Sequence, residues 1–403
     1  MSQQNYIAYH KPSIGTEEIE EVVATMQSGW LTTGPRTMQF EKEFREYVNA
    51  PHSLGVNSCT AGLHLALAAL NLRKGDEVIT TPLTFCATVN VIIHVGATPV
   101  LADILPDCNI DPASVARRIT PRTRAIIPVH FAGLPVDMDA IWTLARRHRL
   151  HVIEDCAHAI GSFYRGWPIG AGNPESGAQS DACAFSFYAT KNITTGEGGM
   201  VTTHDETFAE RMKVLCLHGI SKDAWKRYSA QGQWKYEVLE PGFKYNLGDI
   251  QSALGIHQLK KLPRFLETRK RYAKLYSELL GGMAELEVPL EKADCEHAWH
   301  LYVIKLNLDA ITINRDEFIA LMKERGIGTS VHFIPIPLHP FFAPYAHLAQ
   351  NQCPVTMAMY PRILSLPLYP AMTEKEVIHV ANEVKSLVRS VSKTTTLAVA
   401  GGR

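Results

Sequence analysis

A single lysine, Lys191, lies between two segments of strand-like sequence. Residues 182–188 read ACAFSFY, and a polar, glycine-bearing turn separates Lys191 from a second strand-like segment at 200–203. The pattern predicts a strand, a loop and a strand, and such a loop can hold a lysine at the carboxyl edge of a sheet, where open α/β folds bind ligands. Burial there favours the neutral amine, which attacks a carbonyl to form a Schiff base. Considered alone, a loop lysine is more often an ordinary surface residue.

An acidic pair upstream gives Lys191 a chemical partner. The apolar segment that begins at His151 ends in Glu154 and Asp155, which predicts a buried parallel strand with a carboxylate at its tip. A buried carboxylate needs a cationic partner. The protonated ring nitrogen of pyridoxal 5'-phosphate (PLP) is such a partner, and the carboxylate keeps the ring an electron sink. Asp155 and Lys191 therefore suggest the two ends of this cofactor, while a helix N-cap remains an alternative for Asp155.

Collinear segments along the chain carry a family resemblance. They are SGWLTTGP (28–35), NSCTAGLHLAL (57–67), GDEVITTPLTF (75–85), GATPVLADI (96–104), IPVHFAGLPVDMDAI (127–141), EDCAHAIGS (154–162), FSFYATKNITTGEGG (185–199), GFKYNLGDIQSALG (242–255), HAWHLYVI (297–304) and ERGIGTSVHF (324–333). With them, the chain from about Gly15 to Leu387 resembles the sugar aminotransferases of the DegT/DnrJ/EryC1/StrS family, PLP enzymes of the aspartate aminotransferase fold type. The KNIT, FKYN and HAWH segments are most similar to the UDP-4-amino-4-deoxy-L-arabinose aminotransferase branch and its relatives that act on UDP-4-keto-6-deoxy sugars.

The resemblance implies an α/β fold with a large PLP-binding domain at 13–260 and a smaller C-terminal α/β domain at 261–390. The large domain would have a mainly parallel sheet covered by helices. The sequence pattern agrees, because strand-like and helix-like segments alternate. We expect strands at 78–81, 96–104, 124–130 and 151–155, helices at 111–119 and 137–149, long charged helices after Pro263, and a last helix at 373–388. Residues 391–403 are expected to form a disordered tail.

Two positions can be assigned to the cofactor from local pattern and resemblance together. Residues 53–72 predict a strand, a turn and an amphipathic helix, with Ser58 and Thr60 at the helix start. Cys59 and Thr60 are therefore candidates for holding the cofactor phosphate. Free backbone amides at a helix start bind phosphate, although plain helix capping explains these residues equally well. Phe85 follows the strand expected at 78–81 and could stack on the pyridine ring or pack in a core.

Three further cofactor residues come from the resemblance. His158 would lie beside the ring, Ser186 would donate to the phosphate, and Asn246 would reach the phosphate of the neighbouring subunit's cofactor. A buried, hydrogen-bonded histidine and a helix N-cap are the structural alternatives for His158 and Asn246. Active sites shared in this way imply a homodimer.

The resemblance also implies the reaction. Lys191 would hold PLP as a Schiff base and, once freed by an amino acid, move the Cα proton, while Asp155 keeps the pyridine nitrogen protonated. The amino group would pass from an amino acid, glutamate in the family, to a UDP- or dTDP-linked 4-keto sugar for surface polysaccharide, lipopolysaccharide or amino-sugar biosynthesis. The expected substrate-binding residues are Trp30, Tyr188 and His332; a helix-end turn and a strand edge are the structural alternatives for Trp30 and His332.

Two other functional classes share parts of this pattern. A branch of the same family has histidine in place of the lysine and dehydrates sugars, and a regulator could keep the fold only for binding. Lys191 argues against the dehydratase, since function follows the site and not the fold. The set Phe85, Asp155, Ser186 and Lys191 argues against the regulator, because catalytic groups of this kind cluster at working sites.

Composition gives no reason to expect other classes of partner. The chain has 403 residues, 46% hydrophobic and 20% charged, and a formal net charge of zero, so electrostatics do not favour nucleic acid or an anionic membrane. No apolar segment approaches the roughly twenty residues of a spanning helix, and residues 1–12 lack an apolar signal core, so we expect a cytoplasmic protein. Eight cysteines without a C-x-x-C motif predict reduced thiols. The two histidines of HAWH have no third ligand nearby, so no metal is expected.

Overall fold

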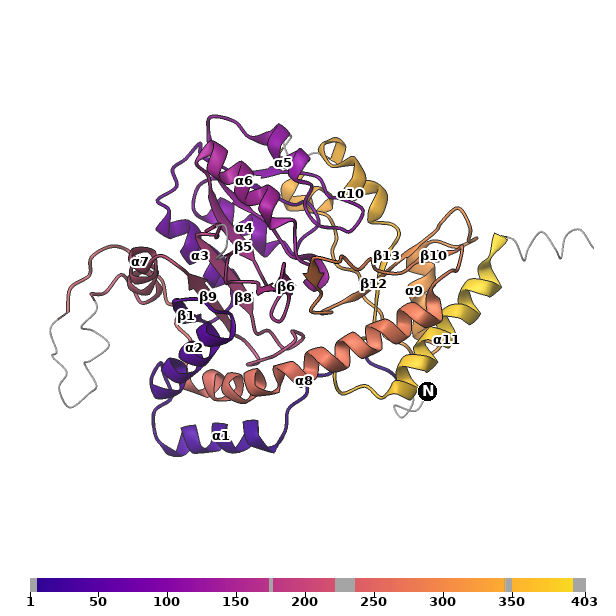
Figure 1. Cartoon of the computed structure of the whole chain (residues 1–403), viewed down its shortest axis with the longest axis horizontal. Coiled ribbons are helices and arrows are strands. Elements are labelled where there is room, and N and C mark those ends of the chain that lie inside the picture. The colour runs from indigo at the N-terminus through magenta and orange to yellow at the C-terminus, as the bar shows by residue number, and fades with distance from the viewer. Residues whose placement is uncertain (1–5, 174–176, 222–235, 344, 346–349, 394–403) are drawn as a thin grey trace, which may run out of the picture.

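The larger part of the molecule is built on a seven-stranded sheet (Figure 1). The structure is a computed structural model that describes residues 6–173, 177–221, 236–343, 345 and 350–393. Across the sheet the strands are β1 (His52–Val56), β9 (Gly199–Thr203), β8 (Ala182–Ser186), β5 (His151–Asp155), β4 (Thr123–Ile127), β2 (Glu77–Thr80) and β3 (Thr98–Leu101). The strands from β8 to β3 pair in parallel, whereas β9 is antiparallel to β8 and β1. The prediction of a mainly parallel sheet is therefore confirmed.

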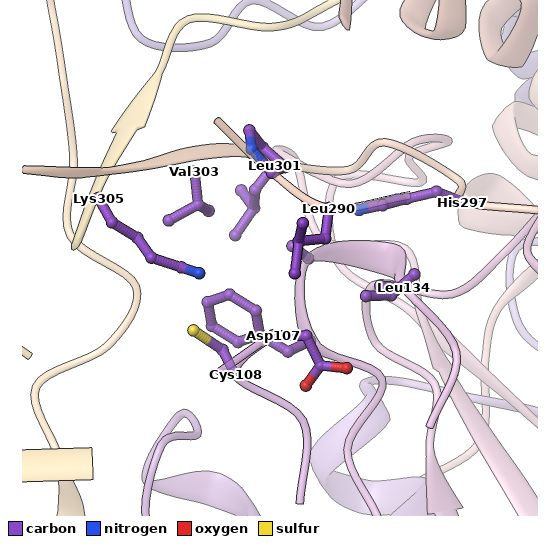
Figure 2. Close-up of a pocket in the computed structure, with 11 residues that line it drawn as sticks. Asp107, Cys108, Leu134, Leu290, His297, Leu301, Val303 and Lys305 are labelled. Atoms are coloured by element: carbon purple, nitrogen blue, oxygen red, sulfur yellow. The ribbon is translucent and has the colours of Figure 1, made fainter. Parts of the chain in front are cut away.

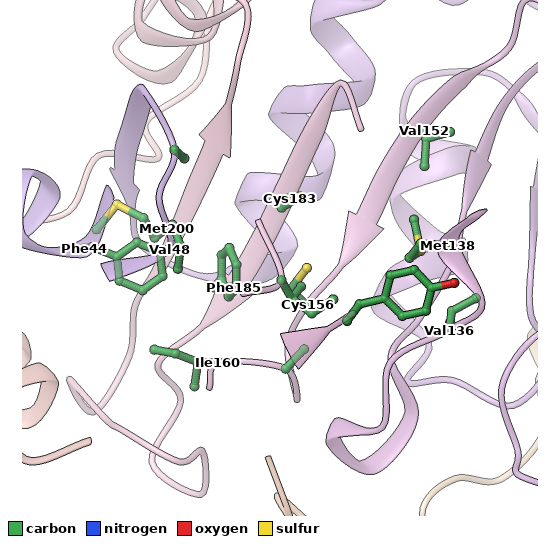
Figure 3. Close-up of a cluster of buried hydrophobic side chains, with 14 of the residues drawn as sticks. Phe44, Val48, Val136, Met138, Val152, Cys156, Ile160, Cys183, Phe185 and Met200 are labelled. Carbon is green, nitrogen blue, oxygen red and sulfur yellow. The ribbon is translucent and has the colours of Figure 1, made fainter. Parts of the chain in front are cut away.

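Helices cover both faces of this sheet because its strands are apolar on both sides. Every residue of β2, β8 and β9 is buried, as is typical of strands covered on both faces. On one face, α2 (Pro35–Tyr47) and α6 (Met138–His148) pack Phe44 and Met138 into a core with Phe185 (Figure 3). On the other face lie α3 (Cys59–Ala69), α4 (Ala87–His94) and α7 (Glu206–Cys216). The shorter helix α5 (Pro112–Arg118) precedes β4.

The C-terminal part has its own sheet and core. Strands β10 (Leu286–Glu287), β12 (Tyr302–Leu306) and β13 (Ile363–Leu366) form an antiparallel sheet. Helices α9 (Arg315–Glu324) and α11 (Glu374–Val391) contribute to the core that includes Tyr302. The remaining elements are β6 (Phe163–Tyr164), β7 (Trp167–Pro168), β11 (Cys295–Glu296), α10 (Pro354–Met359) and the short 3-10 turns η2 (Phe131–Gly133), η4 (Ile336–Leu338), η5 (Pro340–Phe342) and η7 (Gln350–Gln352).

One long helix, α8 (Asp249–Leu280), joins the two parts. It packs against α1 (Thr16–Gln27) and α2 at one end and against α11 at the other (Figure 1). Leu262 lies in the core of the large sheet and Tyr276 in the C-terminal core. The residues after Pro263 are helical to Leu280, as predicted, but they continue the helix that precedes Pro263 and do not form separate helices. Burial of both halves outweighs the backbone hydrogen bond that an exposed proline removes. The predicted domain boundary at residue 260 falls inside α8, and the division into two domains stays a prediction.

The chain end differs from the predicted tail. Ser392 is buried, and Lys393 N–H donates to the carbonyl of Ala310 (2.9 Å). Thr312 N–H donates to the carbonyl of Val391 (2.9 Å). These backbone pairs hold 391–393 against the chain, so a disordered tail does not begin at residue 391. The rest of the predicted tail, 394–403, lies outside the described residues.

The cysteines lie mainly in the interior. All eight are free, and Cys86 and Cys295 are the partly exposed ones. Cys156 and Cys183 lie on adjacent chain segments in the core shown in Figure 3. Within the described residues, no helix has the length and apolar character needed to cross a membrane.

Candidate active site

A cavity of about 630 Å³ opens at the carboxyl edge of the large sheet. Asp155 ends β5 and Ser186 ends β8, and these strands are parallel neighbours, so their carboxyl ends meet at one edge. The cavity brings together most of the predicted site residues: Cys59, Thr60, Phe85, Asp155, His158, Ser186, Tyr188, Lys191 and His332. A cavity of this size is typical of small-molecule sites.

Lys191 lies on the loop that leads from β8 back to β9. Its backbone N–H donates to the carbonyl of Tyr188 (2.9 Å), which makes the loop turn tightly after the strand. Burial lowers the pKa of Lys191 to about 8, and the nearby Cys59 and Asp155 raise it only partly back. At neutral pH a larger fraction of this amine is therefore neutral and nucleophilic than in an exposed lysine.

Asp155 lies at the tip of β5 with only neutral hydrogen-bond donors. The hydroxyl of Thr88 donates to Oδ2 (2.8 Å) and the amide of Ala157 donates to Oδ1 (3.1 Å). Burial raises the pKa of Asp155, and these two hydrogen bonds offset only part of the effect. The Ala157 bond resembles capping, but turns and not a helix follow. A cationic nitrogen against this carboxylate would stabilise its charge, so the residues fit the pyridine nitrogen of PLP.

The first turn of α3 forms another wall of the cavity. Ser58 is the N-cap and accepts from the amide of Ala61 (3.1 Å), so Cys59 and Thr60 are the first helical residues. The first amides of a helix have no partner within it and favour an anion. A side chain at Gly199 would lie 2.7 Å from the Cys59 nitrogen, so β9 approaches this turn closely. Ser186 lines the same cavity, which makes the arrangement compatible with a phosphate group.

Phe85 and His158 belong to the cavity wall. Phe85 is 59% exposed, which rules out the alternative of a core phenylalanine, and its ring lies 6.0 Å from that of Phe333. His158 is buried, and its Nδ1 accepts from the amide of Ala132 (3.3 Å). His158 is therefore the buried, hydrogen-bonded histidine of the structural alternative, and it also lines the cavity.

Trp30 and Asn246 lie outside the cavity of their own chain. The indole N–H of Trp30 donates to the carbonyl of Thr33 (3.0 Å), and the Asn246 amide donates to the hydroxyl of the same threonine (2.8 Å). Gly248 is the N-cap of α8, so the capping alternative for Asn246 is wrong. The two predicted site residues that do not line the cavity therefore both contact Thr33.

Several cavity residues were not predicted from the sequence. Tyr9 and His10 come from the segment before the first helix, and His10 Nε2 contacts the carbonyl of Ala189 (3.1 Å), two residues from Lys191. This segment has no periodic pattern, so nothing in it indicated a contact so distant in sequence. Thr88 and His300 also line the cavity. The HAWH segment, which ends in His300, is the sequence feature that could have indicated this residue.

A much smaller cavity of about 30 Å³ lies around Asp107 (Figure 2). Its lining residues include Cys108, Leu134, Leu290, His297 and Lys305, and it shares none with the Lys191 cavity. Asp107 is already paired with Lys292 (2.5 Å). A space of this size holds about one water molecule, so it is too small for a substrate.

One group of potential metal ligands occurs in the described part of the chain. His130, Glu154 and Cys156 have ligand atoms within 4.8 Å of one another, and all are buried. His130 Nδ1 accepts from the amide of Val136 (3.1 Å), so Nε2 carries the proton and donates to Glu154 (2.8 Å). Both imidazole nitrogens are engaged, so this cluster is a buried hydrogen-bonded pair rather than a metal site.

The fold and the site together define a class of enzyme. A partly buried lysine and a buried carboxylate at the edge of a mainly parallel sheet are the features of PLP-dependent enzymes with the aspartate aminotransferase fold. A family model, described as the DegT/DnrJ/EryC1/StrS aminotransferase family, matches residues 12–385, and the chain belongs to this family. The family is PLP-dependent, as predicted.

Known proteins resemble the chain over nearly its whole length. SpsC of Bacillus subtilis, a spore coat polysaccharide biosynthesis protein, is 48% identical over 96% of this chain and 98% of its own. The structure of Helicobacter pylori PseC, an aminotransferase involved in the biosynthesis of pseudoaminic acid, has a TM-score of 0.87 and 31% identity over 96% of this chain and 100% of PseC. Spr1654 of Streptococcus pneumoniae, solved in its PLP form, has a TM-score of 0.88 and 31% identity over 96% and 99%.

Proposed function

We propose that this protein is an aminotransferase that moves an amino group from an amino acid to a nucleotide-linked keto sugar. The observation that carries the proposal is that Asp155, at the end of β5, and Lys191, on the loop after the neighbouring parallel strand β8, line one cavity. The names of the relatives support it, because PseC is an aminotransferase of pseudoaminic acid biosynthesis and SpsC serves spore coat polysaccharide.

Each residue of the cavity has its own role in the proposed reaction. PLP, when bound, supplies an electron sink for the Cα–H bond of the amino substrate. The neutral amine of Lys191 attacks a carbonyl and, when free, moves the proton as a general base. Asp155 keeps a proton on the pyridine nitrogen through its charge, and Phe85 covers the ring. The amides of Cys59 and Thr60 and the hydroxyl of Ser186 hold the phosphate.

The substrates follow from the family resemblance. Glutamate is the amino donor, and a UDP- or dTDP-linked 4-keto sugar is the acceptor, with the UDP-4-amino-4-deoxy-L-arabinose branch as the nearest type. Tyr188 and His332, which line the cavity, contact the sugar nucleotide. The product serves surface polysaccharide, lipopolysaccharide or amino-sugar biosynthesis, and the enzyme works in the cytoplasm.

The active form is a homodimer with shared active sites. Trp30 and Asn246 are joined through Thr33 and lie outside the cavity of their own chain, as expected for residues that serve a partner. Three apolar side chains on α1 are exposed in the single chain: Ile19, Val23 and Met26. Contact with a second copy would remove this apolar surface from water.

Incubation with glutamate and a panel of UDP- and dTDP-linked keto sugars tests the proposal. We expect an aminated sugar nucleotide, detected by mass, and a visible absorbance band that changes when glutamate is added. Lys191→Ala should abolish both signals, whereas Lys274→Ala, an exposed lysine on α8, should leave them intact. Loss of water from the sugar would indicate the dehydratase, and a band insensitive to glutamate would indicate the regulator; either result refutes the proposal.

A further inference from the structure

The two histidines of the HAWH segment line different cavities. The ring of His297 stacks on Trp299 (centroids 4.0 Å apart, interplanar angle 1°), and its Nδ1 accepts from the Trp299 amide (2.8 Å). It lines the small cavity around Asp107 (Figure 2). His300 instead lines the Lys191 cavity and is only 6% exposed. The reaction steps assigned above leave His300 without a role.

Asn192, the residue after Lys191, determines which nitrogen of His300 carries the proton. The side-chain amide of Asn192 donates to the carbonyls of Ala298 (3.0 Å) and Ile160 (3.5 Å). Its N–H groups are therefore used, and Oδ1 is left as an acceptor. His300 Nδ1 lies 3.2 Å from this Oδ1, so Nδ1 must be the protonated nitrogen that donates.

His300 stays neutral in this environment. Burial holds its pKa well below the ordinary value, and the groups that face it, His158, Lys191, Arg269 and His332, act in the same direction. A neutral imidazole protonated at Nδ1 has an unprotonated Nε2. Because Nδ1 is bonded to Asn192, the polar atom that His300 can offer to a ligand in the cavity is the lone pair of Nε2.

A nitrogen lone pair favours uncharged or cationic groups that can donate a hydrogen bond. It repels phosphate and carboxylate oxygens and accepts from a group that has a hydrogen to donate. We propose that His300 is a substrate-positioning residue whose Nε2 accepts a hydrogen bond from a hydroxyl of the keto-sugar substrate. This inference rests on the proposed function, because the keto sugar carries several hydroxyls. The donor group of glutamate is its reacting amino group, and measuring the two half-reactions separately distinguishes it from a sugar hydroxyl.

The tautomer can be measured without any reaction. Protein labelled with ¹⁵N-histidine, with and without PLP, gives long-range ¹H–¹⁵N spectra in which the two ring nitrogens are distinguished, and the His300→Phe spectrum assigns the signals. We expect a neutral His300 protonated at Nδ1 at pH 7.5. A ring protonated at Nε2, or at both nitrogens, overturns the inference.

Comparing the two half-reactions of the amino transfer distinguishes a contact with the sugar from an effect on the whole active site. We expect His300→Phe to lower kcat/KM for the keto sugar about three- to tenfold, the effect of losing one neutral hydrogen bond. The glutamate half, followed by cofactor absorbance in single turnover, should change less than twofold. His297→Phe is the matched control from the same segment and should change neither. Equal losses in both half-reactions would show that His300 acts on Lys191 or on the stability of the fold and not on the sugar, which would contradict the inference.

A substitution at Asn192 gives an independent readout. In Asn192→Asp the carboxylate still accepts from Nδ1 but stabilises the imidazolium, so the pKa of His300 rises. Below that pKa Nε2 carries a hydrogen and can no longer accept one. We therefore expect kcat/KM of Asn192→Asp for the sugar to fall as the pH decreases. The wild-type enzyme, and the glutamate half-reaction of the variant, should not show this decrease. An unchanged pH profile in a folded variant, judged by circular dichroism, contradicts the inference. If no sugar is aminated by the wild-type enzyme, the proposed function fails, and the tautomer measurement still decides the state of His300.

Discussion

Asp155 reaches the cavity from the end of β5 and Lys191 from the loop after β8, and the charge of Asp155 raises the pKa of Lys191 against the larger lowering effect of burial. β5 ends at Asp155, which pairs with Ala184 on β8, and the chain beyond β8 returns over the sheet edge with Lys191. A basic amine and a carboxylate are thus held near each other without a direct ion pair in the described structure. The cavity of about 630 Å³ that both residues line suits a flat cofactor with a carbonyl at one end and a basic nitrogen at the other.

Asp155→Asn should change stability and function in opposite directions. Because the pKa of Asp155 is raised in the folded protein, the folded state favours the proton, and the ionised group destabilises the cofactor-free fold above its ordinary pKa of 3.8. The amide preserves the shape, so we expect a higher Tm for the cofactor-free variant at pH 7.5. Amino transfer should fall by about 10²-fold or more, because the pyridine nitrogen loses its anionic partner. A lower Tm together with full activity would contradict both arguments.

The amine of Lys191 should titrate near pH 8. Its pKa is lowered from 10.5 to about 8, so the reactive neutral form accumulates as the pH rises through 8. We expect the rate of Schiff-base formation between the cofactor-free protein and PLP, trapped with borohydride, to rise with a midpoint near this value. Lys191→Ala should remove that phase and leave only slower labelling of exposed lysines. A midpoint near 10.5 would show that the surroundings of Lys191 do not lower its pKa.

Mixed dimers test whether Asn246 acts across subunits. If it does, Lys191→Ala and Asn246→Asp homodimers are both inactive, but a mixed dimer contains one intact site, with Lys191 from one chain and Asn246 from the other. Refolding the two variants together at equal amounts should restore about one quarter of wild-type activity, since half of the dimers are mixed and each has one working site. Activity no higher than that of the separate variants would show that Asn246 does not serve the partner's site.

Pro263→Ala should stabilise the protein. Pro263 lies at an exposed position inside α8, where it denies a hydrogen bond to the carbonyl one turn earlier. Restoring that bond in a continuous helix should add about 1–3 kcal/mol to the free energy of unfolding, measured by chemical denaturation. Activity should stay unchanged, because Pro263 does not line the cavity. A destabilised variant would indicate that the proline relieves strain in the helix.

Local sequence predicted the parts of the site that lie at strand ends. An apolar segment that ends in Glu154 and Asp155 forms β5 as predicted, and the aromatic segment before Lys191 forms β8. Parallel strands bring their carboxyl ends to one edge, so Asp155, Ser186 and Lys191 meet there for a reason visible in the pattern. The start of α3 was predicted in the same way, from the cap formed by Ser58.

Contacts between distant segments could not be predicted. Tyr9 and His10 reach the cavity because the first described residues pair with residues 326–328 near the C-terminal sheet, a contact with no local signal. The sequence suggested a break at Pro263, but cores at both ends keep α8 continuous. The chain by itself therefore determined the strands, the lysine and its carboxylate, because hydrophobic pattern and turn chemistry act over a few residues. Only the tertiary structure decided the contact between His300 and Asn192 and the position of Asn246 outside its own cavity, because hydrogen-bond partners are set by packing between segments far apart in sequence.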